Sequence, residues 1–115
     1  MRGAVEFGRK LFAGKVFPSA IICTDGRAAK GLLHAACEAG IKVPEQLSVF
    51  ACSSRAESEQ TFPPLSSIAW NAEEAIFRGI YMLKTLMGHR TLKEPNLTID
   101  PLMTIRESTG RFNNR

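Results

Sequence analysis

The hydrophobic positions of this chain alternate between short apolar runs and longer segments with helical spacing. Apolar residues fill Ser19–Cys23 and again Leu47–Cys52, and each run is too short for a helix, so both are predicted to be strands covered on both faces. Between them, Gly26–Ala39 shows the i, i+3, i+4, i+7 spacing of a single helical face. That face comprises Ala29, Leu32, Leu33, Ala36 and Cys37. A strand, a helix and a strand within roughly 35 residues indicate a right-handed βαβ unit.

The residues that flank this helix support its predicted ends. Asp25 precedes it, and a carboxylate at that position accepts hydrogen bonds from the first helical turn and complements the helix dipole. Gly40 follows it in the position of a C′ glycine, with Ile41 placed for the contact that accompanies a Schellman end.

The same pattern predicts the remaining elements. Gly3–Ala13 is a helix, Arg55–Phe62 is a polar connection that is either short and helical or irregular, and Leu65–Trp70 is a third strand. Asn71 caps a long helix, and Leu92–Ile105 contains one or two short strands. The residues expected on the buried face of the long helix are Ala72, Ile76, Ile80, Leu83 and Met87. We therefore predict an α/β fold with an open, mostly parallel sheet and helices on both faces.

Length and charge narrow the class of protein. The chain has 115 residues, enough for one domain. Its net charge of +4 is spread along the sequence, so solvated helix faces explain it more simply than a nucleic-acid surface, and no helix-turn-helix pattern is visible. No segment reaches 18 apolar residues, and charges interrupt Met1–Pro18, so we expect a cytoplasmic protein that does not enter a membrane.

The sequence offers little support for catalysis. Cys23, Cys37 and Cys52 are odd in number and lack C-x-x-C spacing, which favours buried reduced thiols over a zinc site or a disulfide framework. There is no G-x-G-x-x-G, Walker or G-x-S-x-G motif. An enzyme on a flavodoxin-like sheet stays a minor alternative, and we expect no enzyme activity, no cofactor and no metal site.

Four motifs in order along the chain carry a resemblance to a known family. They are P-S-A-I-I-C-T-D-G-R-A-A-K-G-L-L, E-A-G-I-K-V-P-E-Q-L-S-V-F-A, P-P-L-S-S-I-A-W-N and the closing M-T-I-R-E-S-T-G. Together they resemble the effector-binding domain of LacI/GalR-type transcription regulators. The resemblance implies one half of a periplasmic-binding-protein-like core, with residues 1–110 as its C-terminal subdomain and residues 111–115 as a polar tail. It also implies that the DNA-binding headpiece and the first subdomain are not part of these 115 residues.

The resemblance implies a function of ligand sensing without catalysis. A small molecule, a sugar or related metabolite, would bind in a cleft shared with the missing subdomain. Asp25 takes the position of a family Asn that contacts sugar hydroxyls. Arg27 is next, and its side chain points either into the cleft or into solvent. Ser53 takes the position of an effector-binding Asp, which puts the usual sugar specificity in doubt because a hydroxyl is a weaker acceptor. Trp70 lies at a turn that lines the pocket in family members; the alternative is a tryptophan that packs in the core or between domains. A periplasmic-type sugar-binding protein is the alternative function.

Self-association is a further expectation. In related regulators the C-terminal subdomains pair through the helix equivalent to Arg27–Ala39 and the segment equivalent to Ser53–Phe62. The small residues of this helix would let another backbone approach closely, which predicts a homodimer interface of Ala28, Gly31, Leu32 and Ala35. The alternative is that these residues pack within one subunit.

Overall fold

The computed structural model describes residues 1–112. Met1–Ala69 and the segment from Met103 onward form one compact unit, and Trp70–Leu102 forms a second. The elements of the chain are α1 (Arg2–Ala13), β1 (Ala20–Cys23), α2 (Gly26–Glu38), β2 (Ser48–Cys52), α3 (Arg55–Glu59), β3 (Ser66–Ala69), α4 (Ala72–Met87) and β4 (Leu102–Thr104). All predicted helices and strands are present, with ends within a few residues of those expected. The domain boundary at residue 110 stays a prediction, and residues 113–115 of the proposed tail lie outside the described residues.

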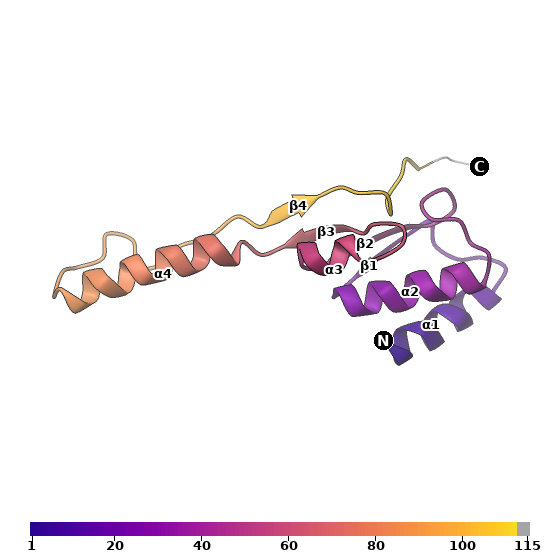
Figure 1. Ribbon diagram of the computed structural model, residues 1–115, viewed down its shortest axis with the longest axis horizontal. Helices are drawn as coiled ribbons and strands as arrows, with labels where there is room; N and C mark the ends of the chain where they lie inside the picture. The colour runs from indigo at the N-terminus through magenta and orange to yellow at the C-terminus, as the bar shows by residue number, and fades with distance from the viewer. Residues whose placement is uncertain (113–115) are drawn as a thin grey trace. The chain divides into compact units, whose positions relative to one another are not determined.

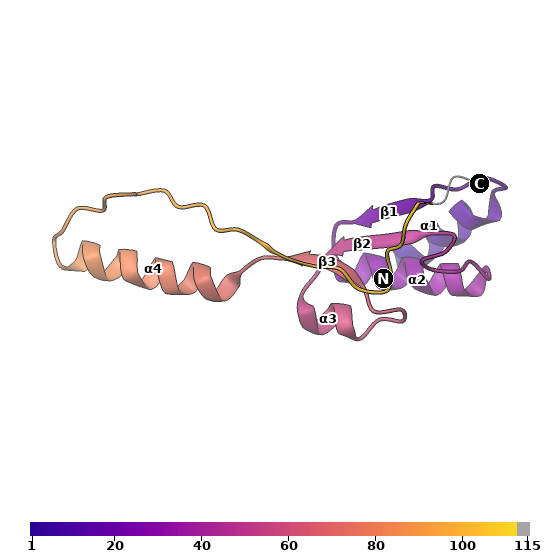
Figure 2. The same cartoon turned by 90° about the horizontal axis from the view of Figure 1, so that it is seen from above.

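The strands form an open sheet in the order β1-β2-β3-β4. β1 and β2 are parallel, as are β2 and β3, with Ile22 opposite Phe50 and Ala51 opposite Ser67. Figure 2 shows the neighbouring strands running in the same direction. The predicted α/β class with an open, mostly parallel sheet is therefore confirmed.

The core of the first unit lies between the sheet and α2. Leu47, Val49, Ala51 and Leu65 are completely buried and pack with the apolar face of α2. Figure 1 shows α1, α2 and α3 on one side of these strands. The helices of this unit do not cover the second face, where the side chain of Ile22 is 77% exposed. The predicted burial of both faces of the first two strands is thus wrong for the chain as described.

α1 packs against α2 through small residues. A Cβ atom added at Gly8 would lie 2.6 Å from the Cβ of Ala35, and one added at Gly31 would lie 2.8 Å from the Cβ of Ala4 and 2.9 Å from the carbonyl oxygen of Met1. Real Cβ atoms do not approach this closely, so the two glycines set the separation of the helices. An ion pair between Arg9 and Glu38, with an N–O distance of 2.7 Å, joins the same helices at their exposed edge.

Both predicted ends of α2 are confirmed. The backbone N–H of Ala28 donates to Oδ1 of Asp25 at 2.8 Å, which makes Asp25 the N-cap. Gly40 has φ +70°, and the N–H of Ile41 donates to the carbonyl of Ala36 at 2.9 Å. This pattern is the Schellman end that the sequence predicted.

Side chains of the R-E-S-T segment, Arg106–Thr109, form hydrogen bonds with the amino ends of β2 and β3. The hydroxyl of the buried Ser108 accepts from the N–H of Ser66 at 2.8 Å and donates to the carbonyl of Val49. The guanidinium of Arg106 donates to the carbonyl of Leu65 at 2.8 Å and to the hydroxyl of Ser67 at 3.0 Å. These side chains satisfy backbone groups that the strand ladder leaves free, so this motif has a structural role.

Two predictions of burial fail outside the core. Asn71 caps α4 as predicted, but none of the residues of α4 is buried, and Ile76 and Met87 are 63% and 72% exposed. Cys23 is buried, whereas Cys37 and Cys52 are exposed. Apolar spacing identifies the face of a helix or strand that is apolar, but it does not say which part of the chain covers that face.

None of the helices within residues 1–112 is long and apolar enough to cross a membrane.

Candidate functional site

The site we consider lies where β1 and β2 end in the first unit. Asp25 follows the last residue of β1 by two positions, and Ser53 directly follows β2. Because the two strands are adjacent and parallel, their carboxyl ends meet at the same edge of the sheet. Ligands of open parallel sheets bind at this edge. The predicted residues Asp25 and Ser53 are thus brought to the same edge.

Asp25 combines a structural contact with a free acceptor. Its Oδ1 atom receives the N–H of Ala28, whereas Oδ2 has no hydrogen-bond partner within residues 1–112. Burial raises the pKa of the neighbouring Cys23 thiol, and the Asp25 carboxylate raises it further. The thiol therefore stays protonated and unreactive near neutral pH. Asp25 is the group at this turn that can bind a hydrogen-bond donor.

Ser53 is more enclosed than the sequence suggests. Only 7% of its surface is exposed, and its hydroxyl donates to Oε2 of Glu57 at 3.3 Å and makes a longer contact of 3.4 Å with the carbonyl of Ser54. A Cβ atom at Gly26 would overlap the Ser53 hydroxyl and would lie 3.0 Å from Oε2 of Glu57. The Ser53 hydroxyl and the Glu57 carboxylate can therefore keep these positions because residue 26 has no side chain.

Glu57 is a residue of this site that the sequence analysis missed. Arg55–Phe62 was predicted only as a short helical or irregular polar connection, although Ser54 and Glu57 have the S-x-x-E spacing of a capping box. The structure confirms the cap, because the Glu57 N–H donates to the Ser54 hydroxyl at 3.2 Å. That spacing was the available signal, since it places an acid one turn beyond the end of β2.

The other two predicted site residues are exposed. Arg27 lies in the first turn of α2, and its side chain makes no hydrogen bond or ion pair with any residue from 1 to 112. Trp70 belongs to the second unit, where it precedes the cap of α4 and its side chain is 83% exposed. Its role in lining a pocket stays a prediction.

The residues predicted to form the dimer interface pack against other residues of the same chain. Gly31, Leu32 and Ala35 are buried, and Ala28 packs at the edge of the core. α1 covers Gly31 and Ala35 at the close distances described above. The alternative considered from the sequence, packing within one subunit, is what the structure shows for these residues. A second copy cannot reach Gly31 and Ala35 while α1 remains in place.

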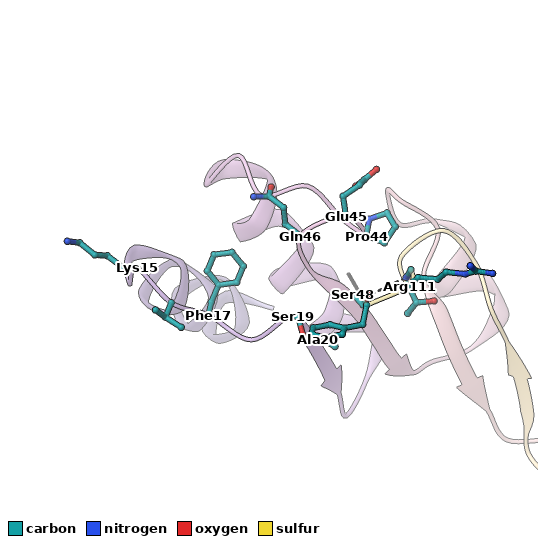
Figure 3. A pocket seen from close by; sticks show the side chains of 13 residues that line it. Lys15, Phe17, Ser19, Ala20, Pro44, Glu45, Gln46, Ser48 and Arg111 are labelled. Atoms are coloured by element: carbon teal, nitrogen blue, oxygen red, sulfur yellow. Dashed lines mark hydrogen bonds between the residues drawn. The ribbon is translucent and has the colours of Figure 1, made fainter. Parts of the chain in front are cut away.

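A hollow of about 840 Å³ lies at the other end of the sheet. It is bordered by the first residues of β1 and β2, Ala20 and Ser48, and by Phe17 from the preceding loop (Figure 3). Figure 3 shows the charged ends of Lys15 and Arg111 pointing away from each other. Because its charged groups do not converge, the hollow lacks the set of polar groups that fixes the orientation of a ligand in a specific site. Its lining comes from three separate segments, and no motif in the sequence indicated it.

Residues 1–112 contain no group of three or more His, Cys, Asp or Glu side chains that could hold a metal ion. The chemistry at the edge formed by Asp25, Ser53 and Glu57 is instead that of hydrogen-bond acceptors. An open parallel sheet with acceptors at its carboxyl edge defines an α/β ligand-binding domain.

The chain belongs to the periplasmic binding protein-like domain family, whose model matches residues 3–109. More closely, it resembles the domain of LacI/GalR-type transcription regulators, as its motifs indicated. The regulator GalR of Streptococcus thermophilus is 33% identical over 102 residues, covering 87% of this chain and 30% of that protein. The chain thus spans less than a third of the length of the curated relatives it matches. These relatives are transcription regulators and not enzymes.

Solved structures show the same fold. A LacI-family regulatory protein from Chloroflexus aggregans superposes with a TM-score of 0.85 at 24% identity, covering 95% of this chain and 40% of that one. A LacI-family regulator from Lactobacillus casei with bound sucrose superposes with a TM-score of 0.77 at 18% identity. The match covers 94% of this chain and 40% of that one. At these identities the likeness concerns the fold.

Proposed function

We propose that this chain is the part of a LacI/GalR-type regulator that senses a small hydroxyl-rich effector, a sugar or a related metabolite. The observation that carries the proposal is the pairing of two acceptor-bearing turns, at Asp25 and Ser53, on one carboxyl edge of a parallel sheet. A relative crystallised with sucrose supports a sugar as the ligand class. The periplasmic-type alternative shares the fold, but the relatives at about 30% identity are regulators, which favours regulation.

The proposed mechanism is a change of domain orientation. The acceptors of this chain form one wall of the cleft, and a second subdomain supplies the other wall. An effector that binds the closed arrangement better than the open one shifts the equilibrium between them, and this changes the affinity of a DNA-binding headpiece. DNA is contacted only through that headpiece, and the regulator acts in the cytoplasm. In this proposal Arg27 and Trp70 contribute further contacts to the effector.

Self-association as a homodimer is a separate element of the proposal, and the surface differs from the one first predicted. The outer sides of α1 and α2 form an open groove of about 390 Å³ whose lining includes Met1, Val5, Lys30 and His34. Apolar side chains between charged ones suit a two-fold interface, because the same patch then meets its own complement. This groove takes the place of the small residues that α1 already covers.

The test of effector sensing is a titration of the ¹⁵N-labelled chain with sucrose and with D-glucose, followed by the amide shifts. We expect saturable shifts at Gly26 and Ser53 and an affinity weaker than about 10 μM, since half a cleft loses contacts and desolvation. A tighter constant would contradict the shared cleft. Shifts confined to the hollow around Phe17 would contradict the site.

A further inference from the structure

The exposed acceptor at the carboxyl end of β2 is Glu57 and not Ser53. Ser53 is almost completely buried, and its hydroxyl proton is directed to Oε2 of Glu57. Glu57 itself is exposed, and its Oε1 atom has no hydrogen-bond partner within residues 1–112. A ligand that approaches this turn therefore meets the carboxylate of Glu57 before it meets the serine.

Gly26 makes room for this arrangement. A Cβ at position 26 would lie 3.0 Å from Oε2 of Glu57 and 3.1 Å from the Cβ of Ser53, and it would overlap the Ser53 hydroxyl. Any larger residue at position 26 would have to displace the Ser53–Glu57 pair. The carboxylate thus lies between the turn that follows β1 and the turn that follows β2, which is the edge where Asp25 also lies.

Asp25 and Glu57 are used in the same way. Each engages one carboxylate oxygen inside the chain, Oδ1 with the Ala28 N–H and Oε2 with the Ser53 hydroxyl. Each leaves its second oxygen free among the described residues. Hydrogen bonds to carboxylates are stronger than those to neutral acceptors, and two such oxygens on adjacent turns suit a ligand that offers several hydroxyl donors.

On the basis of the proposed function, we propose that Glu57 is a specificity-determining residue of the effector site and selects neutral, hydroxyl-rich ligands over phosphorylated ones. Glu57 and Asp25 accept hydrogen bonds from ligand hydroxyls. The same two negative charges repel a phosphate group, because bringing like charges together is unfavourable.

Glu57 also has a local structural role. It stands in the first turn of α3, where a carboxylate complements the helix dipole. A loss of stability in a Glu57 variant would therefore test only this structural role and not a contact with the ligand. The experiment therefore needs a ligand readout and a variant that preserves the helix.

The first experiment compares the affinity of wild-type chain, Glu57→Gln and Glu59→Gln for D-glucose and D-glucose 6-phosphate by amide shifts. Glu59 is the matched control, because it lies on the same helix and pairs with Arg55 at its exposed surface. We expect Glu57→Gln to bind D-glucose about tenfold more weakly, as for the loss of one charge-assisted hydrogen bond, and Glu59→Gln to match wild type. The phosphorylated sugar should bind wild type more weakly than D-glucose does.

The outcomes separate this proposal from the one on which it rests. The absence of any saturable shift in wild type with D-glucose or sucrose would contradict the effector site as a whole. Equal binding of D-glucose by wild type and Glu57→Gln, or tighter binding of the phosphorylated sugar by wild type, would overturn only the role of Glu57.

A second experiment tests the position of the carboxylate without a ligand. Ser53→Asp places a second acid next to Glu57, so its urea midpoint should fall below that of wild type by repulsion at contact distance. Adding Glu57→Gln should restore most of the loss, whereas adding Glu59→Gln should not. Equal midpoints for Ser53→Asp with and without Glu57→Gln would show that Glu57 is not beside residue 53 and would overturn the proposal.

Discussion

Gly8 and Ala35 meet where α1 lies against α2, so closely that a Cβ on Gly8 would come within 2.6 Å of the Cβ of Ala35. Ala35 is 1% exposed. This contact explains why small residues recur on both helices. They pack between α1 and α2 of one chain and are not part of a surface that a second copy can contact. Ala35→Arg, which would test a dimer interface if this face were open, should instead disrupt the fold.

Gly31→Ala tests the close packing of the helices. The added methyl would meet Ala4 and the carbonyl of Met1 below 3 Å, so we expect a loss of about 1–3 kcal/mol in the free energy of unfolding, measured by urea denaturation. Gly3→Ala is the control, because nothing lies within 4 Å of a Cβ there and alanine favours the helix. A Gly31→Ala chain as stable as wild type would contradict the packing described.

Asp25→Ala separates the cap from the site. The variant loses the acceptor for the Ala28 N–H, and unfolding should become easier by about 1 kcal/mol. Asp25→Asn keeps a capping oxygen, so most of the stability should remain while sugar affinity changes, because the charge is lost. Unchanged affinity in both variants would leave Asp25 with the structural role alone.

Ser108→Ala tests the fastening of β2 to β3. The substitution removes the acceptor of the Ser66 N–H inside the protein, and a buried unpaired group costs about 1–3 kcal/mol. Ser19→Ala is the matched control, since Ser19 is exposed and its hydroxyl makes no hydrogen bond within residues 1–112. Equal urea midpoints for the two variants would rule out the fastening role.

The Arg9–Glu38 pair predicts a dependence of stability on pH. The hydrogen bond and charge of Arg9 hold the pKa of Glu38 below its ordinary value. The stabilisation is therefore complete above the ordinary pKa and is lost as the pH falls through the lowered one. The difference in stability between wild type and Glu38→Gln should shrink as the pH falls from about 5 through the lowered pKa of Glu38. Glu45→Gln is the control, because Glu45 forms no ion pair within residues 1–112. The difference in stability between wild type and Glu45→Gln should not shrink in the same way as the pH falls.

Self-association can be tested on the outer groove. We expect a discrete dimer in sedimentation at about 100 μM and a monomer for Val5→Glu, which places a charge in the groove. Phe7→Glu is the control on the same helix, because Phe7 is exposed and lies outside the groove lining. A monomeric wild type, or a Val5→Glu variant that still forms dimers, would exclude this surface.

The sequence predicted the elements well because their signals are local. Asp25 and Gly40 mark the ends of α2 through hydrogen bonds within a few residues, and the apolar spacing between them identifies the buried face. The pairing of small residues between α1 and α2 could not be predicted, because Gly31 serves an internal and an external helix contact equally well. Ile22 was expected to be buried because a strand run does not reveal whether both faces of its sheet are covered.

The candidate site was predicted in part for a similar reason. Asp25 was predicted from the end of its strand and from the family resemblance, and Ser53 was predicted from that resemblance. The enclosure of Ser53 depends on Gly26 and Glu57, which come from two different turns. That contact is tertiary, and no spacing along the chain reports it.

We propose the carboxyl edge of β1 and β2, at Asp25 and Ser53, as the ligand-binding edge of this chain. The most direct measurement is the set of isotope-filtered NOEs between protons of bound sucrose and protons of the labelled protein. We expect NOEs to Asp25, Gly26 and Glu57. NOEs to Phe17 and Ala20 at the opposite end of the sheet, with none to the carboxyl edge, would contradict this proposal.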